Sequence, residues 1–112
     1  MKLVTAIIQP EKLEDVQRAL LHHGVSGITI TEVSGYGRQR GHVEVYRGAE
    51  FTIDFIFKVK LEVLVDDEAC DALVDVIADA CRTGNVGDGK IWVVDVDSVT
   101  RVRTGERDHA AI

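Results

Sequence analysis

The alternation of apolar and polar residues along this chain of 112 residues predicts four strands and two helices. Residues 2–8 form a continuous run of β-prone residues, which is typical of a buried strand. Residues 28–33 and 58–65 alternate between apolar and polar side chains, as strands with one covered face do. The run 91–96 predicts a fourth strand, and residues 99–103 a short extended piece after it.

The segment between the first two strands has the features of an amphipathic helix. Leu13, Val16 and Leu20 recur at helical spacing and would face a core. Pro10 suits the first turn of a helix, because its φ angle is already helical and no N–H group is needed there. Gly24 can adopt the left-handed conformation that ends a helix, so we expect the helix to stop there.

A second helix is predicted between the third and fourth strands. Asp66 or Asp67 can cap it, and Glu68 lies near the positive end of the helix dipole. Its apolar stripe consists of Cys70, Leu73, Val74, Ile77 and Cys81. The two cysteines would lie about 16 Å apart along the helix, too far for a disulfide. We therefore expect buried, reduced thiols, which are typical of a cytoplasmic protein.

The order β-α-β-β-α-β predicts a single α+β domain over residues 1–112, ferredoxin-like, with an antiparallel sheet. Two amphipathic helices would cover one face of the sheet. The other face carries a mixture of polar and apolar residues: Thr29, Thr31, Val33, Lys60, Glu62 and Leu64. That face is too apolar for water and too polar for a monomer core, so we expect a homo-oligomer that packs on it.

Residues 34–57, between the second and third strands, have no clear periodicity. A connection of this length in a compact domain is usually functional or disordered. It contains four glycines and three arginines, which offer backbone freedom and forked donors for anions. Its apolar side chains include Val43, Val45, Tyr46 and Phe51. A solvated loop has little use for them, so we favour an arm that docks on a protein over a disordered loop.

Residues 82–90 form a glycine-rich connection with a basic end. Residues 84–90 read Gly-x-x-x-x-Gly-Lys, which is most of a Walker motif. A Walker loop follows a strand and has a hydroxyl residue after the lysine, whereas this one follows a helix and has Ile91 there. Its glycine N–H groups could still form a nest for phosphate oxygens, with Lys90 as a point charge. The alternative is a plain glycine connection.

Arg101 and Arg103 follow the last strand, on one face of the predicted extended piece. Paired guanidinium groups suit a polyphosphate, although a charged strand edge is an alternative explanation. Together the three basic segments would surround one nucleotide. The formal net charge of −6 argues against a nucleic-acid-binding protein. The four histidines form no metal-binding pattern and no nucleophile–base pair is evident, so we expect a binding protein and not an enzyme.

The chain offers no pattern for membrane insertion or export. No run approaches the roughly 20 apolar residues that span a bilayer. The first residues lack a signal-peptide cleavage pattern. We therefore expect a cytoplasmic protein without direct membrane insertion.

Several of these segments resemble the PII nitrogen-regulatory signal-transduction proteins, across essentially the whole chain. The matching motifs are Gly35-Tyr36-Gly37-Arg38-Gln39, Tyr46-Arg47-Gly48-Ala49-Glu50-Phe51, Lys58-Val59-Lys60 and Arg101-Val102-Arg103-Thr104-Gly105-Glu106. The most specific is Thr83-Gly84-Asn85-Val86-Gly87-Asp88-Gly89-Lys90-Ile91-Trp92-Val93, the family's C-terminal signature. The resemblance implies a homotrimer with three nucleotide sites between subunits.

The resemblance also implies the ligands and the residues that hold them. ATP or ADP would contact Ile7, Thr29, Gly35, Gly37, Arg38, Glu62 and Leu64. The phosphates would contact Gly87, Asp88, Gly89 and Lys90, with Arg101 and Arg103 from a neighbouring subunit. Gln39 would help to ligate Mg²⁺ beside ATP and, with Gly41, Lys58 and Gly87, would bind 2-oxoglutarate. The ligands would set the conformation of residues 34–57, which would dock on an ammonium transporter or a nitrogen-assimilation enzyme.

The chain departs from the family pattern at four positions that matter. Phe51 replaces the tyrosine that many members modify, and Ala49 replaces a serine that some phosphorylate, so we expect no covalent modification at either. Gln9 replaces a commonly basic residue, which predicts weaker 2-oxoglutarate binding. Phe57 replaces a common proline and is expected to alter how the arm returns to the sheet.

Two other functions remain open from the sequence. One is a PII-like trimeric sensor of a different small ligand, such as bicarbonate or an adenylyl nucleotide. The other is a slow nucleotide-processing enzyme that uses the glycine loop. Gln39, Lys58 and the Gly-Asp-Gly-Lys run favour the standard PII function, and the lack of a clear nucleophile or base argues against the enzyme.

Overall fold

The structure is a computed structural model that describes residues 1–35, 42–46, 49–53 and 55–112, with only the backbone described for 42–46 and 49–53. The strands are β1 (Lys2–Ile8), β2 (Thr29–Gly35), β3 (His42–Tyr46), β4 (Ala49–Ile53), β5 (Ile56–Val65) and β6 (Gly89–Asp95). The α-helices are α1 (Leu13–His22) and α2 (Asp67–Cys81), and two short 3-10 helices are η1 (Pro10–Lys12) and η2 (Asp108–Ala111). None of the described helices is both long and apolar enough to cross a membrane.

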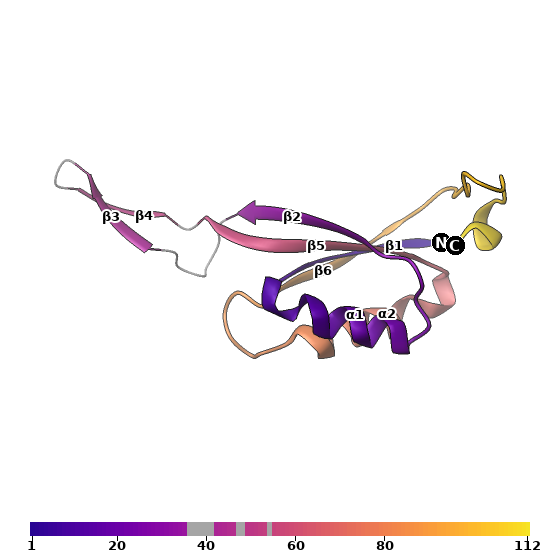
Figure 1. The fold of residues 1–112 in the computed structure, drawn as a ribbon, viewed down its shortest axis with the longest axis horizontal. Coiled ribbons are helices and arrows are strands. Elements are labelled where there is room, and N and C mark those ends of the chain that lie inside the picture. Colours follow the sequence, from indigo (N-terminus) through magenta and orange to yellow (C-terminus); the bar gives the residue numbers. More distant parts are fainter. Residues whose placement is uncertain (36–41, 47–48, 54) are drawn as a thin grey trace.

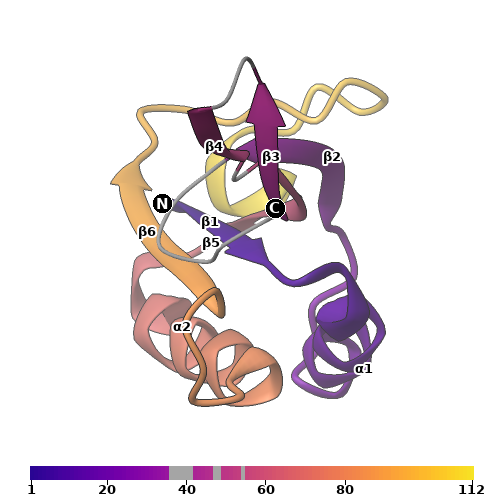
Figure 2. The ribbon, with the colours of Figure 1, turned by 90° about the vertical axis from the view of Figure 1, so that its left-hand side faces the viewer.

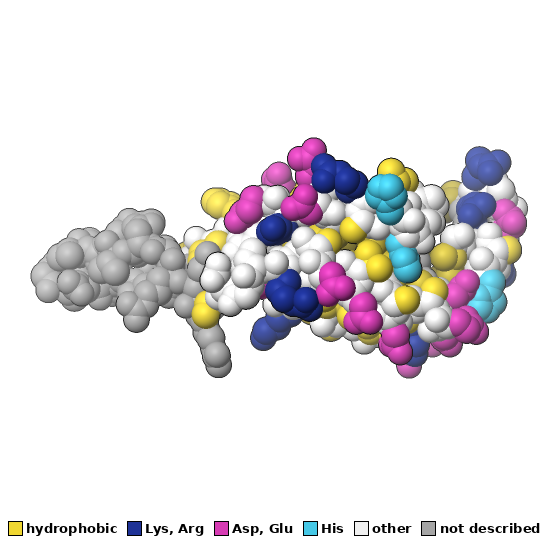
Figure 3. Space-filling view, turned by 90° about the horizontal axis from the view of Figure 1, so that it is seen from below, with side chains coloured by type: hydrophobic (Ala, Val, Ile, Leu, Met, Phe, Trp, Pro, Cys, Tyr) yellow, Lys and Arg dark blue, Asp and Glu magenta, His cyan; other side chains and the backbone are white. Residues whose placement is uncertain are grey.

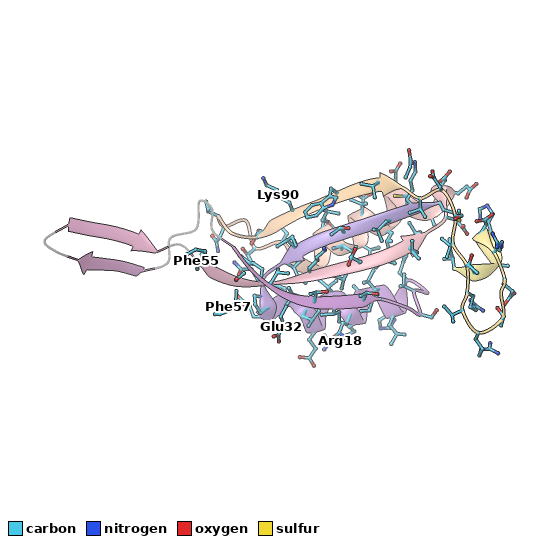
Figure 4. The ribbon with its side chains drawn as sticks, turned by 90° about the horizontal axis from the view of Figure 1, so that it is seen from above. Arg18, Glu32, Phe55, Phe57 and Lys90 are labelled. Carbon is cyan, nitrogen blue, oxygen red and sulfur yellow. The ribbon has the colours of Figure 1, made fainter. Side chains whose placement is uncertain are left out.

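The main sheet has four strands in the order β2-β5-β1-β6, and every neighbouring pair is antiparallel. α1 and α2 lie side by side against one of its faces (Figures 1 and 2). The predicted α+β architecture, with two helices on one side of an antiparallel sheet, is confirmed. Figure 4 views the opposite face, which these helices leave open.

Cross-strand pairing determines which side chains share a face of the sheet. Leu61 of β5 lies opposite Ala6 of β1 and Ile30 of β2, on the side of the helices. Ile7 lies opposite Lys60 and Lys90, on the open side. By the same register the six residues of the predicted mixed face all belong to the open side: Thr29, Thr31, Val33, Lys60, Glu62 and Leu64.

The core lies between the sheet and the two helices. The sheet contributes Val4, Ala6, Ile8, Val59, Leu61, Val63 and Val65. The helices contribute Val16, Leu20, Cys70, Leu73, Ile77 and Cys81. The cysteines are buried free thiols, as expected, and burial raises the pKa of both thiols. Every second residue of the strands and one stripe of each helix meet in this core, because side chains alternate along a strand and recur every 3.6 residues along a helix.

The start and the end of α1 follow from two residues with restricted or permissive backbones. Pro10 begins the 3-10 turn η1, and the α-helix proper starts at Leu13. Gly24 has a φ of +94°, and its N–H donates to the Leu21 carbonyl at 3.1 Å. The N–H of Val25 donates to the Leu20 carbonyl at 3.0 Å, which completes the pattern of a Schellman cap. The predicted stop at Gly24 is therefore correct.

The segment 34–57 is more regular than its sequence suggested. Its first two residues extend β2 and its last two begin β5, while β3 and β4 pair with each other in a separate antiparallel sheet. This hairpin projects from one end of the main sheet (Figure 1). The prediction of no clear periodicity was wrong for 42–46 and 49–53, because strands of five residues carry too short a pattern to stand out in a long glycine-rich stretch.

Charged residues of both signs cover the face that the helices present to solvent (Figure 3). Arg18 of α1 lies 3.6 Å from Asp15 and 4.0 Å from Glu14, and Arg82 lies 3.0 Å from Asp79. Such exposed pairs contribute little to stability.

Candidate functional site

The connection between α2 and β6 approaches the end of β1 very closely at Gly89. The residue pairs with Ile8, and a Cβ atom built on Gly89 would lie 1.7 Å from the carbonyl oxygen of Ile7. Its φ of +108° also lies in the region that glycine favours. Only glycine fits here, so this end of the loop is held directly against the sheet.

Asp88 organises the same loop from within. Its carboxylate accepts hydrogen bonds from the backbone N–H groups of Thr83 at 2.8 Å and Gly84 at 2.9 Å, and from the Thr83 hydroxyl. The hydroxyl and amide donors hold the pKa of Asp88 below its ordinary value. The expectation of a glycine-loop anion nest therefore needs refining, because two of the loop's amides already serve the loop's own carboxylate.

Lys58, near the start of β5, reaches the glycine loop. Its Nζ atom donates to the carbonyl oxygen of Gly87 at 2.6 Å. Partial burial lowers the pKa of this lysine. Lys58 and Gly87, which the family resemblance assigns to the same ligand, are 29 positions apart in the chain and are brought into contact.

Further cationic side chains lie on the open face beside this loop. Lys60 of β5 and Lys90 of β6 lie on either side of Ile7 of β1. Lys90 lies at the end of β6 from which the β3–β4 hairpin projects (Figure 4). Gly35 ends β2 at the same end of the sheet. We call this group the loop end of the site: Ile7, Gly35, Lys58, Gly87, Asp88, Gly89 and Lys90.

The remaining described candidates lie progressively toward the other end of the sheet. Thr29 begins β2 opposite Glu62, and Leu64 lies opposite Leu3 near the start of β1. The C-terminal segment 99–112, which carries Arg101 and Arg103, follows the far end of β6 and lies on the side of the molecule away from the β3–β4 hairpin (Figures 1 and 4). β6 alone, at about 3.4 Å per residue, puts roughly 20 Å between the two ends. Thr29, Glu62 and Leu64 therefore lie along the sheet between the two ends, with Thr29 and Glu62 only two residues from the level of Ile7. We call Arg101 and Arg103 the tail end.

The prediction that residues 99–103 are extended holds only at its start, where Thr100 forms an isolated β-bridge with Arg107, and was wrong for residues 102 and 103. The chain turns at 102–104, with the N–H of Arg101 bonded to the Glu106 carbonyl and the N–H of Gly105 to the Arg101 carbonyl, both at 2.8 Å. Arg101 also directs its guanidinium to Glu106 at 3.5 Å and to the Ile112 carbonyl at 3.4 Å. The two arginines therefore do not share one face of a strand, because the positive φ that Gly105 adopts allows the chain to close a tight loop there.

Other predicted residues cannot be placed. Gly37, Arg38, Gln39 and Gly41 lie outside the described residues, so the magnesium ligand and part of the 2-oxoglutarate set remain predictions. Phe51 belongs to β4, where only the backbone is described.

Sequence reasoning missed Thr83, whose hydroxyl and amide both bond Asp88. A threonine beside a Gly-Asn turn, five residues before an aspartate, is the signal that could have indicated it.

Comparison with known proteins gives the family of the chain. Residues 1–106 match the model of a family described as "Nitrogen regulatory protein P-II". The chain belongs to the P-II family. It is 53% identical to nitrogen regulatory protein GlnK of Escherichia coli (strain K12), over the full length of both chains. It is 55% identical, again over both full lengths, to nitrogen regulatory protein P-II 1 of the same strain and of Salmonella typhimurium.

The family confirms the resemblance inferred from the motifs. The P-II relatives are named as regulatory proteins, which agrees with a signalling role for this chain. The geometry of this P-II chain adds one fact: the loop end and the tail end of the site are separate within a single copy.

Proposed function

We propose that this P-II protein is a cytoplasmic sensor that binds ATP or ADP, with Mg²⁺, at sites between the subunits of a homotrimer. It catalyses no reaction, and the bound ligand determines whether it docks on its target. The observation that carries the proposal is the separation of the candidate residues into a loop end and a tail end. A site that uses both groups is complete only when a second copy brings its tail end to the loop end of the first.

The open face of the sheet supports assembly on that side. Leu64, Trp92 and Val94 lie on this face and are 38%, 45% and 47% exposed. Neighbouring exposed apolar residues are typical of a surface that another protein covers. Closed assembly around this face would bury them and bring the two ends of the site together.

The loop end supplies groups suited to the phosphates. The Asp88 carboxylate keeps residues 83–88 in one conformation, so the backbone of Gly87, Gly89 and Lys90 is held for a ligand in advance. The ammonium groups of Lys60 and Lys90 lie on either side of Ile7 and provide positive charge. A polyphosphate would be held by this combination of oriented amides and point charges.

2-Oxoglutarate is the effector that we assign to the base of the arm. Lys58 directly follows the arm and donates a hydrogen bond to the Gly87 carbonyl. A dicarboxylate that binds the Lys58 ammonium group would compete with this hydrogen bond. Binding of the dicarboxylate would therefore couple the conformation of the arm to that of the glycine loop. Gln39 and Gly41 would complete this site together with Mg²⁺ and ATP. A ligand shifts the conformational equilibrium of residues 34–57 only by the difference between its binding free energies for the two conformations. A difference of about 1.4 kcal/mol changes the ratio of the two conformations tenfold. An ammonium transporter or a nitrogen-assimilation enzyme is the target that we propose for this arm.

Titration calorimetry with MgATP, with and without 2-oxoglutarate, tests the proposal. We expect ATP binding in the micromolar range, strengthened by 2-oxoglutarate. Lys90→Ala should weaken ATP binding by roughly tenfold, the value of a charged contact. Arg18→Ala, on the outer face of α1, is the matched control and should leave binding unchanged. No heat with ATP at high micromolar concentration would contradict the proposal, and ATP binding without any effect of 2-oxoglutarate would remove the ketoacid from it.

A further inference from the structure

The C-terminal residues 99–112 form a compact loop that is closed by its own backbone. The N–H of Asp108 donates to the Val99 carbonyl at 2.8 Å, and Thr100 forms an isolated β-bridge with Arg107. The Asp108 side chain accepts from the Val99 N–H at 3.3 Å, with Asp108 in a left-handed conformation at a φ of +57°. This loop carries Arg101 and Arg103 and ends in the short helix η2.

A side-chain contact joins this loop to the body of the protein. The Nδ1 atom of His109 lies 2.5 Å from the Oδ1 atom of Asp66. Among the residues that the structure describes, this is the one hydrogen bond or ion pair between residues 99–112 and the rest of the chain. Residues 96–98 are the covalent connection between the loop and β6.

Within the described part of the chain, the Asp66 carboxylate makes its hydrogen bond to His109. Asp66 is the N-cap residue of α2, yet its carboxylate makes no hydrogen bond to the helix. The adjacent Asp67 bonds the N-terminal amine at 2.6 Å. Both chain termini lie at this end of the sheet (Figure 1), although Figure 2 shows that they are apart from each other. The histidine therefore anchors η2 where the N-terminus and the start of α2 already meet.

We propose that Asp66 and His109 form a latch that positions Arg101 and Arg103 for a nucleotide bound at a neighbouring copy. The proposal rests on the function proposed above, since it assigns the regulation of that same site. Loss of the Asp66–His109 contact leaves residues 99–112 closed by their own backbone hydrogen bonds, but the loop can then change its orientation relative to the sheet. The two guanidinium groups must then be ordered when the nucleotide binds, which lowers affinity.

Four variants separate the latch from general damage to the fold. His109→Ala and Asp66→Ala each remove one partner. His109→Asn keeps an N–H donor near the position of Nδ1 and should restore the contact. Asp75→Ala removes an exposed carboxylate from the middle of α2 and serves as the matched control for Asp66→Ala.

Backbone order parameters from NMR relaxation test the latch without any ligand. In the wild type and His109→Asn, residues 99–112 should have values near 0.85, typical of rigid backbone. In His109→Ala and Asp66→Ala they should fall below about 0.6, while Asp75→Ala should resemble the wild type. Rigid residues 99–112 in His109→Ala would overturn the latch.

ATP titration tests what the latch does. His109→Ala and Asp66→Ala should weaken ATP binding by about three- to tenfold, the worth of one exposed hydrogen bond, and His109→Asn should restore it. In an Arg103→Ala background the effect of His109→Ala should be smaller, because both changes act through one group. Unchanged affinity in His109→Ala, or additive effects of the two changes, would overturn the positioning role. If the wild type binds no ATP, the proposed function fails, whereas the order parameters still decide whether the latch exists.

Discussion

Gly89 shows how much of the candidate site depends on the space around one backbone atom. A β-carbon here would meet the Ile7 carbonyl, and the positive φ would strain any L side chain. The residue lies between the Asp88 carboxylate, which closes the glycine loop, and Lys90, which the loop presents to the open face. Gly89 is therefore required by packing before any ligand is considered.

Replacing Gly89 with alanine should destabilise the protein. We expect the Gly89→Ala variant to lose about 2 kcal/mol or more of unfolding free energy, because both the clash and the backbone strain must be relieved by moving β1 or the loop. Urea denaturation measures this loss. Gly27→Ala is the control, since a β-carbon at Gly27 meets nothing within 4 Å, and its stability should change by less than about 0.5 kcal/mol. Equal stabilities of the two variants would show that the close approach at Gly89 is not rigid.

At the scale of the element, α2 connects the core to both ends of the site. Its inner face buries two thiols beneath the sheet, its C-terminus leads into the glycine loop, and its N-terminus meets the C-terminal latch. Burial raises the pKa of Cys70, with Asp71 adding to the effect, and burial raises that of Cys81, with Asp88 adding to it. Neutral thiols are thus part of the packing of this helix.

The thiols should be unreactive in the folded protein. At pH 8 we expect a disulfide reagent to modify Cys70 and Cys81 at least tenfold more slowly in the native state than in urea, because burial blocks access and disfavours the thiolate. The pKa of each thiol is higher in the folded state than in the unfolded state. The neutral thiols therefore contribute to the free energy of unfolding below the ordinary thiol pKa of about 8.5, and this contribution is lost as the pH rises above it. A Ser98→Cys variant, with an exposed added thiol, provides the fast-reacting control. Rapid native labelling of Cys70 and Cys81 would contradict their burial.

The whole molecule has an open sheet face, with candidate site residues along it and at both of its ends. Thr5 lies on that face and is only 2% exposed, whereas Trp92, directly opposite it on β6, is 45% exposed. The face thus has a packed centre near β1 and an apolar margin along β6. An assembly that covers this margin would also complete the nucleotide site that we propose.

A charge on the margin should prevent assembly. We expect Trp92→Glu to reduce the mass measured by light scattering from that of a trimer to that of one chain, because an unpaired buried carboxylate is costly. The same variant should lose ATP binding, since no second copy then supplies a tail end. Leu21→Glu, which alters a residue of α1 that is 72% exposed, should remain a trimer. A trimeric Trp92→Glu protein would mean that copies meet on another surface.

Local patterns in the sequence predicted most of the fold correctly. Residues 2–8 were predicted as the first strand, and β1 has the same bounds. The stop of α1 at Gly24 and the apolar stripe of α2 also agree with the structure, because helix ends and amphipathic faces depend on neighbours within a few residues. The features that were not predicted are the strands 42–46 and 49–53 and the turn at 102–104, which are short and depend on pairing partners and turns.

The sequence by itself determined the composition of the candidate site and the family to which the chain belongs. The glycine loop, Lys58 and the two arginines carry recognisable residue types at recognisable spacing. Only the tertiary structure decided which of them meet. Lys58 contacts Gly87, Asp88 closes the loop, His109 holds the tail at Asp66, and the arginines lie at the opposite end of the sheet. The physical reason is that spacing along a chain controls local geometry, whereas contacts across 29 or 43 residues depend on the register of paired strands and on how helices pack.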